Sequence, residues 1–286
     1  MNGKQKAAFI QKVKTYYTEQ GRHDLPWRHT TDPYKIAVSE VMLQQTQVAR
    51  VIEKYKEFLK AFPTAHSLAN APLQQVLLQW SGLGYNRRAR FLQQMAQVVI
   101  NNQSPSLKLR RTKAGKFPKT FDELLELPGI GTYTAGAICA FAYNQPVVMI
   151  ETNVRTVYLH HFRKALSKTK DNDKVSDKEL LPLIEATLDQ KNPRQWYWAL
   201  MDYGSFLKSQ GIRIHRNSVH YKKQSAFKGS VREVRGAIMK ILTVRPATAL
   251  QLQKITGFET ARIEAATQAL LKEGIVTRQG KQLKIG

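Results

Sequence analysis

The spacing of apolar residues constrains the fold of this chain more than any other feature. Through most of the first 207 residues, apolar residues recur every three or four positions, and few segments alternate. Such spacing lines one face of an α-helix, whereas a half-buried strand would alternate. Helices are predicted over 4–20, 34–45, 47–61, 73–79, 86–101, 121–126, 132–143, 152–165, 176–190 and 193–207, with a polar surface loop over 103–119. The pattern indicates a mainly α fold.

A change of composition marks a boundary at 208–229, a polar and basic stretch that contains no acidic residue. Helical spacing resumes beyond it, over 231–243, 247–255 and 259–273. Two short strands then flank Gln279 and Gly280, which is a hairpin signal. Three helices and a small hairpin are typical of a winged-helix domain. We therefore predict a helical domain over 1–207, a basic linker over 208–229 and a winged-helix-like domain over 230–286.

The charge of the chain indicates a polyanionic partner. It has 45 Lys and Arg against 21 Asp and Glu, a net charge of +24. Nucleic acid rewards dispersed Lys and Arg, because each contact with phosphate releases counterions. An anionic membrane surface is the alternative, although no apolar run is long enough to span a bilayer and no signal segment opens the chain. We expect a soluble, monomeric, cytoplasmic protein associated with the nucleoid, in which the single cysteine, Cys139, is buried.

A glycine-rich turn, Leu127-Pro-Gly-Ile-Gly-Thr-Tyr-Thr-Ala-Gly136, is the sharpest local motif. Pro128, Gly129 and Gly131 predict a tight turn between two helices, with main-chain N–H groups pointing outward at the start of the second helix. Such groups and the helix dipole bind a phosphate without reading a base. An ordinary helical hairpin is the alternative, and the net charge favours DNA binding.

Two acidic residues lie where a carboxylate would be chemically useful. Glu40 is on an otherwise apolar helix, where burial disfavours the charged form and suits a general acid. The alternative is a solvent-facing Glu near a helix start. Glu151 follows an apolar run and precedes a helix that Thr152 or Asn153 would cap. A carboxylate there would stabilise a cationic sugar, or it would serve the helix end alone.

Four segments in a fixed order resemble the MutY-like family of adenine DNA glycosylases. They are Pro26-Trp-Arg with Asp32-Pro-Tyr, Ser39 to Val48, Gly82 to Arg90, and Leu127 to Gly136. The similarity covers about residues 20–207, and G·T/U mismatch thymine glycosylases are also similar. The resemblance implies a helix-hairpin-helix glycosylase fold of two helical subdomains, and a substrate of double-stranded DNA with a mispaired or damaged base.

The resemblance also implies catalytic roles. Glu40 matches the general acid that protonates the leaving base, and Glu151 stands where the family has a catalytic Asp that stabilises the sugar cation. Asn153 matches an active-site asparagine. Tyr133 stands where some relatives have a catalytic tyrosine and bifunctional relatives have a Schiff-base lysine. The absence of lysine there implies a monofunctional enzyme that leaves an abasic site.

Other matched residues imply contacts with DNA and with the excised base. Gln45 and Tyr85 match residues that wedge into the base stack when the target is flipped out. Gly129, Gly131 and Thr134 belong to the turn that contacts phosphate. Trp27 and Arg28 match residues near the base pocket, with a core aromatic and a surface cation as the alternatives.

The sequence departs from the family in three places. Glu151 replaces Asp, and an error of ~1 Å in positioning a catalytic group can cost ~10²-fold in rate. Trp198 stands where the family has a glutamate that reads adenine; Trp would stack on a flipped base or narrow the pocket. The cysteine ligands of the iron–sulfur cluster are absent, their positions being taken by Lys208, His215, Ser218 and about Gln224.

Those replacements cannot bind a four-iron cluster, so we expect no cofactor and no metal. The loop stays basic and is expected to contact the DNA backbone through Arg213, Arg216, Lys222 and Lys223. The winged-helix-like domain stands where the family has a domain that recognises 8-oxoguanine. It would contact phosphate through Arg262, Arg278, Lys281 and Lys284, or it would bind a partner protein.

The predicted function is excision of adenine opposite guanine or 8-oxoguanine. Thymine, uracil or another modified base opposite guanine is the alternative, because of Trp198. A hypothesis of another class is a catalytically inactive DNA-binding regulator.

Overall fold

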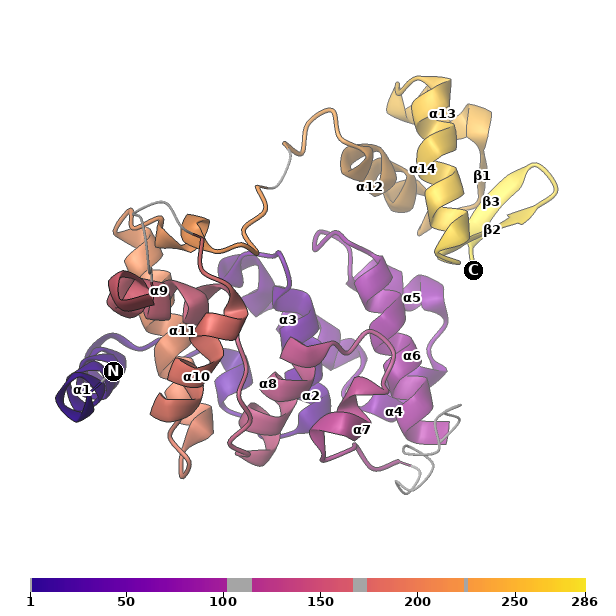
Figure 1. The fold of residues 1–286 in the computed structure, drawn as a ribbon. Helices are drawn as coiled ribbons and strands as arrows, with labels where there is room; N and C mark the ends of the chain where they lie inside the picture. The colour runs from indigo at the N-terminus through magenta and orange to yellow at the C-terminus, as the bar shows by residue number, and fades with distance from the viewer. Residues whose placement is uncertain (1, 102–114, 167–173, 224–225) are drawn as a thin grey trace. The chain divides into compact units, whose positions relative to one another are not determined.

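A computed structural model describes residues 2–101, 115–166, 174–223 and 226–286, and over these residues the chain is mainly helical (Figure 1). This confirms the predicted fold class. The chain forms two compact units, one of residues 1–36, 119–125 and 130–223, the other of residues 37–118, 126–129 and 224–286. None of the described helices is both long and apolar enough to cross a lipid bilayer.

The helices of the first unit are α1 (Gly3–Gln20), the 3-10 helix η1 (Pro26–Arg28), α7 (Phe121–Leu125), α8 (Thr132–Tyr143), α9 (Thr152–Leu166), α10 (Asp177–Thr187), α11 (Pro193–Ser209) and the 3-10 helix η3 (Ile214–Asn217). Helix α11 packs against α9, and α1 packs against α11. Phe9 of α1 joins them: its ring centroid lies 5.2 Å from Tyr158 on α9 and 6.1 Å from Trp196 on α11. Tilted aromatic pairs of this kind contribute ~0.5–1.5 kcal/mol beyond their buried area.

The second unit begins within α2 (Pro33–Leu43) and contains α3 (Val48–Ala61), α4 (Ala65–Asn70), α5 (Leu73–Gln79), α6 (Arg87–Asn101), α12 (Val231–Leu242), α13 (Ala249–Thr256), α14 (Thr260–Lys272) and the strands β1 (Ala247–Thr248), β2 (Val276–Gln279) and β3 (Gln282–Ile285). Helices α4 and α5 pack against α6. In the C-terminal part, Val234, Ile238 and Leu242 recur every fourth residue on α12 and are buried. Helix α12 packs against α14.

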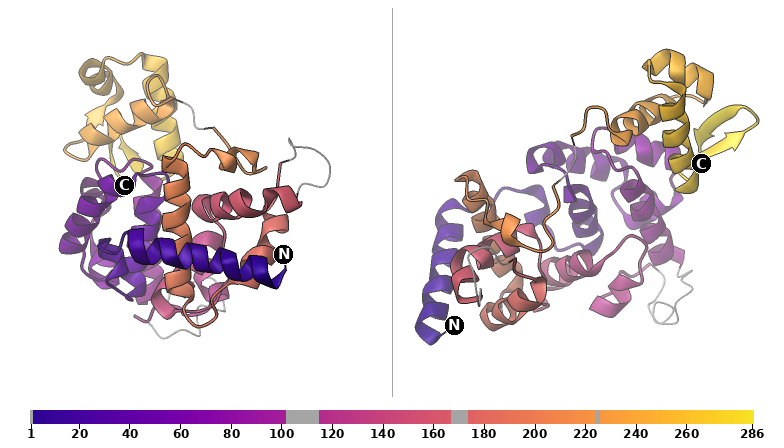
Figure 2. Two further views of the ribbon diagram at one scale, coloured as in Figure 1. Left: turned by 90° about the vertical axis from the view of Figure 1, so that its left-hand side faces the viewer. Right: turned by 45° about the horizontal axis from the view of Figure 1, so that its top comes forward.

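The three strands form an antiparallel sheet in the order β1-β3-β2. Arg278 pairs with Leu283 and Gln279 with Gln282, and Gly280 in the turn has a φ of +58°. Helices α12 to α14 and the hairpin form one group in all views (Figures 1 and 2). This is the arrangement expected of a winged-helix-like domain, and its boundaries as a separate domain stay a prediction.

The structure corrects some predicted boundaries. Helix α2 ends at Leu43 because Gln45 adopts a left-handed φ of +55°. Ala247 and Thr248 begin no helix, because they pair with β3. Helix α4 was not predicted; it has only six residues, too few for a periodic pattern. Most of the predicted 103–119 loop lies outside the described residues.

Candidate functional site

Glu151 caps the first turn of α9 with its side chain. Its Oε1 accepts hydrogen bonds from the main-chain N–H groups of Asn153 (2.7 Å) and Val154 (3.0 Å). The first N–H groups of a helix have no partner within it, and together with the helix dipole they favour a negatively charged acceptor. The capping role foreseen for this position therefore belongs to Glu151 itself, and the cap holds the carboxylate in one place.

Asn153 lies beside this carboxylate and carries an unused acceptor. Its Nδ2 donates to Glu151 Oε2 at 3.3 Å, whereas its buried Oδ1 accepts no hydrogen bond. A buried polar atom without a partner costs about 1–3 kcal/mol. Asn153 Oδ1 is therefore suited to receive a hydrogen bond from a ligand or a water molecule next to Glu151.

Helix α11 approaches this pair at Gly204. A Cβ atom added to Gly204 would lie 2.4 Å from the carbonyl oxygen of Asn153 and 2.8 Å from its carbonyl carbon. Only glycine allows the two backbones to come so close. The packing of α11 thus determines where the start of α9, with Glu151 and Asn153, lies.

Lys208 follows Gly204 by four residues and so shares its face of α11. Burial lowers the pKa of the Lys208 ammonium, and the charge of Glu151 acts in the opposite direction. Lys208 therefore places a positive charge near the Glu151 carboxylate, at one of the positions where the resemblance predicts a cluster ligand.

Asp202 binds the two arginines near the start of the chain. Its side chain is buried and accepts from Arg28 Nη1 at 2.7 Å, Arg28 Nη2 at 2.8 Å and Arg22 Nε at 2.7 Å. Burial acts to raise the pKa of Asp202, but the hydrogen bonds and charge of Arg28, with Arg22, hold it below its usual value. The alternative that Arg28 is a surface cation is wrong, because its side chain is only 4% exposed.

Arg28 in turn supports Trp198. The guanidinium carbon lies 5.4 Å from the Trp198 ring centroid, and Trp198 stacks on Phe141 at 6.0 Å. Trp198 is half-buried, whereas Trp27 is buried, as the core-aromatic alternative expects. Their base-pocket roles stay predictions, with Arg28 already bound to Asp202.

The glycine-rich turn uses its two glycines differently. Gly129 has a φ of +75°, and an added Cβ would lie 2.5 Å from Phe91 Cβ, so the protein itself requires glycine there. Gly131 is the N-cap of α8 with a φ of −97°, and no atom lies within 4 Å of an added Cβ. Because none of the residues that the structure describes demands glycine at 131, the open space is suited to a group approaching the helix start from outside.

Residues that follow this turn differ in exposure. Tyr133 is half-buried in the first turn of α8. Thr134 is only 2% exposed, so the contact with DNA predicted for it is limited to its main chain. The Thr134 side chain cannot contact DNA, because it is packed inside the protein. The residues of α8 that follow it, through Ala142, are also buried.

Glu40 is on α2 in the second unit and is 5% exposed. Its neighbours Val38, Val41 and Met42 are buried as well. The alternative of a solvent-facing Glu near a helix start is wrong. The apolar setting expected for a general acid is present, and the catalytic role stays a prediction.

Gln45 and Tyr85 share an unusual backbone conformation. Both are exposed, with φ of +55° and +48°. Non-glycine residues adopt the left-handed region at a cost and often do so at functional sites. The conformation holds both side chains outside regular helices, which suits the predicted wedge role.

Arg88 is a residue whose importance the sequence did not reveal. Its Nη1 donates to the carbonyl oxygens of Val41, Met42 and Gln44 at 2.6–2.9 Å, and its Nη2 donates to those of Leu83 and Gly84 at 3.1 Å. It therefore caps α2 and joins the two loops that carry Gln45 and Tyr85. Burial lowers the pKa of Arg88 to about 10.

The basic loop after α11 is held by contacts of the chain itself. Val175 and Ser218 form a bridge, and the rings of His215 and Tyr221 lie 5.5 Å apart. Arg213 donates to the carbonyl oxygen of Lys208. Its predicted DNA-contacting cations, Arg213, Arg216, Lys222 and Lys223, are all exposed.

These residues do not fit an iron–sulfur cluster. A four-iron cluster requires cysteine thiolates, and the only cysteine, Cys139, is buried in α8, where burial raises the pKa of its thiol to about 11. Of the corresponding positions, Lys208 is cationic and Ser218 Oγ accepts from the N–H of His220, while Gln224 lies outside the described residues. Among the described residues, no group of His, Cys, Asp and Glu could hold a metal ion.

Comparison with known proteins agrees with this geometry. The sequence profile of the HhH-GPD superfamily base excision DNA repair proteins matches residues 38–184. An adenine DNA glycosylase of Buchnera aphidicola is 35% identical over 199 residues, covering 70% of this chain and 52% of that protein. One of Mycolicibacterium smegmatis is 32% identical over 276 residues, covering 90% of this chain and 89% of that protein.

Solved structures show the same fold. A thermostable thymine-DNA glycosylase has 25% sequence identity and a TM-score of 0.61, covering 76% of this chain and 97% of that one. An endonuclease III in a non-covalent complex with DNA has 21% identity and a TM-score of 0.52, covering 79% and 91%.

The helical hairpin at Gly129–Gly131 and the capped carboxylate at the start of α9 define a helix-hairpin-helix protein. The chain belongs to the HhH-GPD superfamily of base excision DNA repair proteins. It spans about half the length of the first curated relatives that it matches, 52% and 53% of two Buchnera proteins.

Substituting Gly204→Ala should lower the free energy of unfolding by about 1–3 kcal/mol, because the added methyl would collide with the backbone of Asn153. Urea denaturation measures this. Gly236→Ala on α12 is the matched control: an added Cβ there has no atom within 4 Å, so a gain of roughly 0.5–1 kcal/mol is expected. Equal effects of the two substitutions would contradict the close-approach argument.

Replacing Arg88 by Met should lower the free energy of unfolding by about 3 kcal/mol or more, because hydrogen bonds from a charged donor each contribute ~1.5–3 kcal/mol. Arg87→Met serves as control, since Arg87 is exposed and lies over the Phe91 ring at 4.7 Å. Its effect should stay within about 1 kcal/mol. If thermal and urea unfolding show the same loss of stability for both variants, Arg88 does not join the two loops.

Proposed function

We propose that this protein is a monofunctional DNA glycosylase that hydrolyses the N-glycosidic bond of a mispaired or damaged base in double-stranded DNA. Adenine opposite guanine or 8-oxoguanine is the proposed substrate. The observation that carries the proposal is the carboxylate of Glu151, held by two N–H donors beside the unsatisfied Oδ1 of Asn153. Relatives of 30–35% identity are adenine DNA glycosylases, which supports this choice of base.

In the proposed reaction, the bond between C1′ of the sugar and the base nitrogen breaks, and its electron pair leaves with the base. Glu40 protonates the leaving base, a role suited to a buried carboxyl group. Glu151 stabilises the positive charge that develops on the sugar. Water then supplies the hydroxyl group at C1′, and its other proton returns to the Glu40 carboxylate, so that an abasic site remains. Tyr133 takes the place of the Schiff-base lysine of bifunctional relatives, so no strand cleavage is expected.

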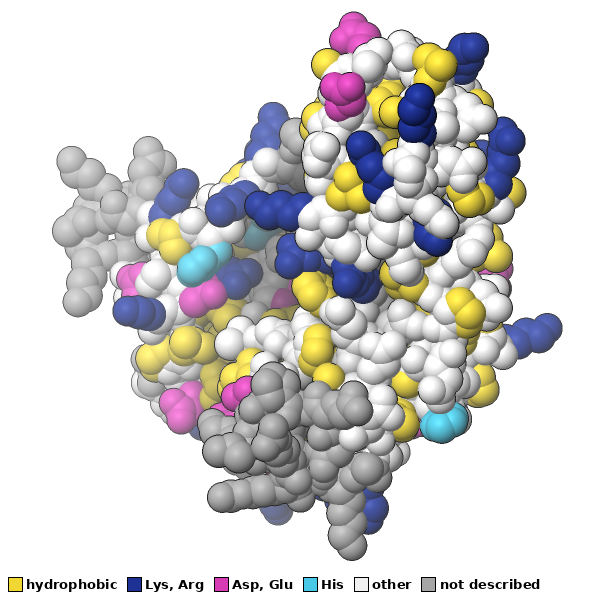
Figure 3. Space-filling view, turned by 90° about the vertical axis from the view of Figure 1, so that its right-hand side faces the viewer, with side chains coloured by type: hydrophobic (Ala, Val, Ile, Leu, Met, Phe, Trp, Pro, Cys, Tyr) yellow, Lys and Arg dark blue, Asp and Glu magenta, His cyan; other side chains and the backbone are white. Residues whose placement is uncertain are grey.

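The mode of DNA binding follows from exposed N–H groups and cations. Gly131 leaves open space before the first turn of α8, where main-chain N–H groups suit a phosphate. Lys and Arg side chains are spread over the face drawn in Figure 3, in keeping with the net charge of +24. We propose that a monomer binds DNA without a cofactor, in the cytoplasm at the nucleoid.

A second substrate class is favoured by a specific observation. Trp198 presents a half-buried aromatic surface, held by Arg28 and Phe141, in place of a base-reading carboxylate. A thymine-DNA glycosylase is among the similar structures. Thymine or uracil opposite guanine is therefore the alternative substrate.

Abasic-site formation on a panel of duplexes tests the proposal. Duplexes with A·G, A·8-oxoguanine, T·G and U·G pairs are incubated with enzyme, and alkali then reveals abasic sites. We expect the adenine duplexes to react fastest. Glu40→Gln, a substitution of equal size, should slow base release by ~10²–10⁴-fold while duplex affinity stays within about threefold.

Each result of the panel has a definite meaning. Faster release of thymine or uracil would move the substrate to the alternative class. Tight binding without release from any duplex would identify a catalytically inactive regulator. Borohydride trapping of a covalent protein–DNA adduct at the rate of turnover would show a bifunctional lyase.

Purified protein should be colourless and contain less than about 0.1 iron per chain, because the chain cannot supply four thiolates. Iron analysis and the visible absorbance spectrum measure this. A brown protein with stoichiometric iron, lost together with activity on chelation, would contradict it.

A further inference from the structure

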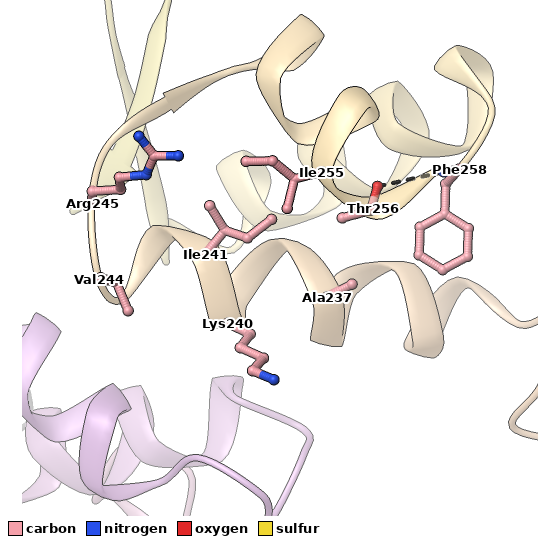
Figure 4. A pocket seen from close by; sticks show the side chains of 8 residues that line it. All are labelled: Ala237, Lys240, Ile241, Val244, Arg245, Ile255, Thr256 and Phe258. Carbon is pink, nitrogen blue, oxygen red and sulfur yellow. Dashed lines mark hydrogen bonds between the residues drawn. The ribbon is translucent and has the colours of Figure 1, made fainter.

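An apolar groove lies open on the C-terminal part of the chain. It has a volume of about 530 Å³ and is lined by Ala237, Lys240, Ile241, Val244, Arg245, Ile255, Thr256 and Phe258 (Figure 4). The lining residues come from α12, from the turn that follows it, and from α13 with the turn before α14. None of them belongs to the predicted catalytic or base-pocket residues.

Helix α12 has two apolar stripes, and only one of them is buried in the core. Val234, Ile238 and Leu242 face the core and are buried. Ala237 and Ile241 form the second stripe and line the groove together with Val244, which lies in the turn after α12 and is 73% exposed. Across from it, Ile255 is 52% exposed. Contiguous apolar surface of this kind typically marks a binding site.

The charged residues at the groove indicate what kind of partner it binds. Lys240 and Arg245 lie at the groove, both exposed, and the guanidinium of Arg262 lies 4.9 Å from the Phe258 ring. None of the described residues that line the groove is acidic, and the nearby Glu233 lies 3.8 Å from Arg262. A partner must therefore combine apolar anchors with negative charge. A second copy of this chain, with a net charge of +24, would be repelled.

Duplex DNA complements the positive charges at the groove but not its apolar lining. Phosphates pair with Lys and Arg, but a DNA backbone offers no side chains of the size of Leu or Phe to cover Ile241, Val244 and Ile255. A peptide helix does so by anchors at i, i+3 or i+4 and i+7. We propose that the groove between α12 and α13 binds an acidic amphipathic segment of a partner protein.

Selection from a random peptide library tests this without assuming a sequence. The full-length protein selects from sixteen-residue peptides displayed on phage, with the Ile255→Glu variant used for counter-selection. Enriched peptides should pair bulky apolar residues at helical spacing with Asp and Glu. Synthetic copies should bind Ile255→Glu and Val244→Glu at least tenfold more weakly than the wild type.

Leu250→Glu is the matched control. Leu250 is also on α13 and is 61% exposed, but it does not line the groove. It should leave peptide affinity within twofold. Because all three positions are exposed, the variants should unfold at the temperature of the wild type, which differential scanning calorimetry verifies.

A charge variant and a competition separate peptide from DNA. Lys240→Glu together with Arg245→Glu should weaken peptide binding at least tenfold. A twenty-base-pair duplex without a mismatch should not displace the peptide, and Ile255→Glu should leave duplex affinity unchanged. The proposal is wrong if no peptide is enriched over the counter-selection, if the enriched peptides are not acidic, or if duplex DNA competes for the groove.

Discussion

The direct backbone contact between α11 and the first turn of α9 is the constraint on which the site depends. Gly204 lets α11 approach so closely that any side chain would strike the carbonyl group of Asn153. Glu151 and Asn153 occupy the start of α9, so their positions follow from this packing. Phe9, which packs on both α9 and α11, holds α1 against the same pair of helices. A rigid support of this kind is what the catalytic role proposed for Glu151 requires.

Each unit contains a cluster around a buried charge. In the first unit, Asp202 binds Arg28 and Arg22, and Arg28 then lies against Trp198. In the second unit, Arg88 binds five main-chain carbonyl oxygens and so joins the loops of Gln45 and Tyr85. Charged groups inside a protein must be paired, because an unpaired buried charge is costly. Both clusters meet this condition and place residues that the sequence singles out.

Contacts within the chain hold the basic loop after α11 at the positions where the resemblance predicts cluster ligands. They are a bridge between Val175 and Ser218, a ring contact between His215 and Tyr221, and the hydrogen bond from Arg213 to the Lys208 carbonyl oxygen. These contacts are individually weak, but they leave Arg216, Lys222 and Lys223 exposed. The loop is therefore held by its own contacts while its positive charges stay exposed.

The sequence by itself determined the helical fold class, the hairpin turn and the membership of a glycosylase family, because periodicity and linked motifs are local properties. It left capping by Glu151 and burial of Glu40 as open alternatives, and it could not show that Arg28 pairs with Asp202, since these partners lie 174 residues apart. The left-handed backbone of Gln45 and Tyr85, the burial of Thr134 and the five acceptors of Arg88 also came only from the tertiary structure. Such features depend on which helices meet and how closely. That is decided by packing over long distances in the chain, which no local pattern records.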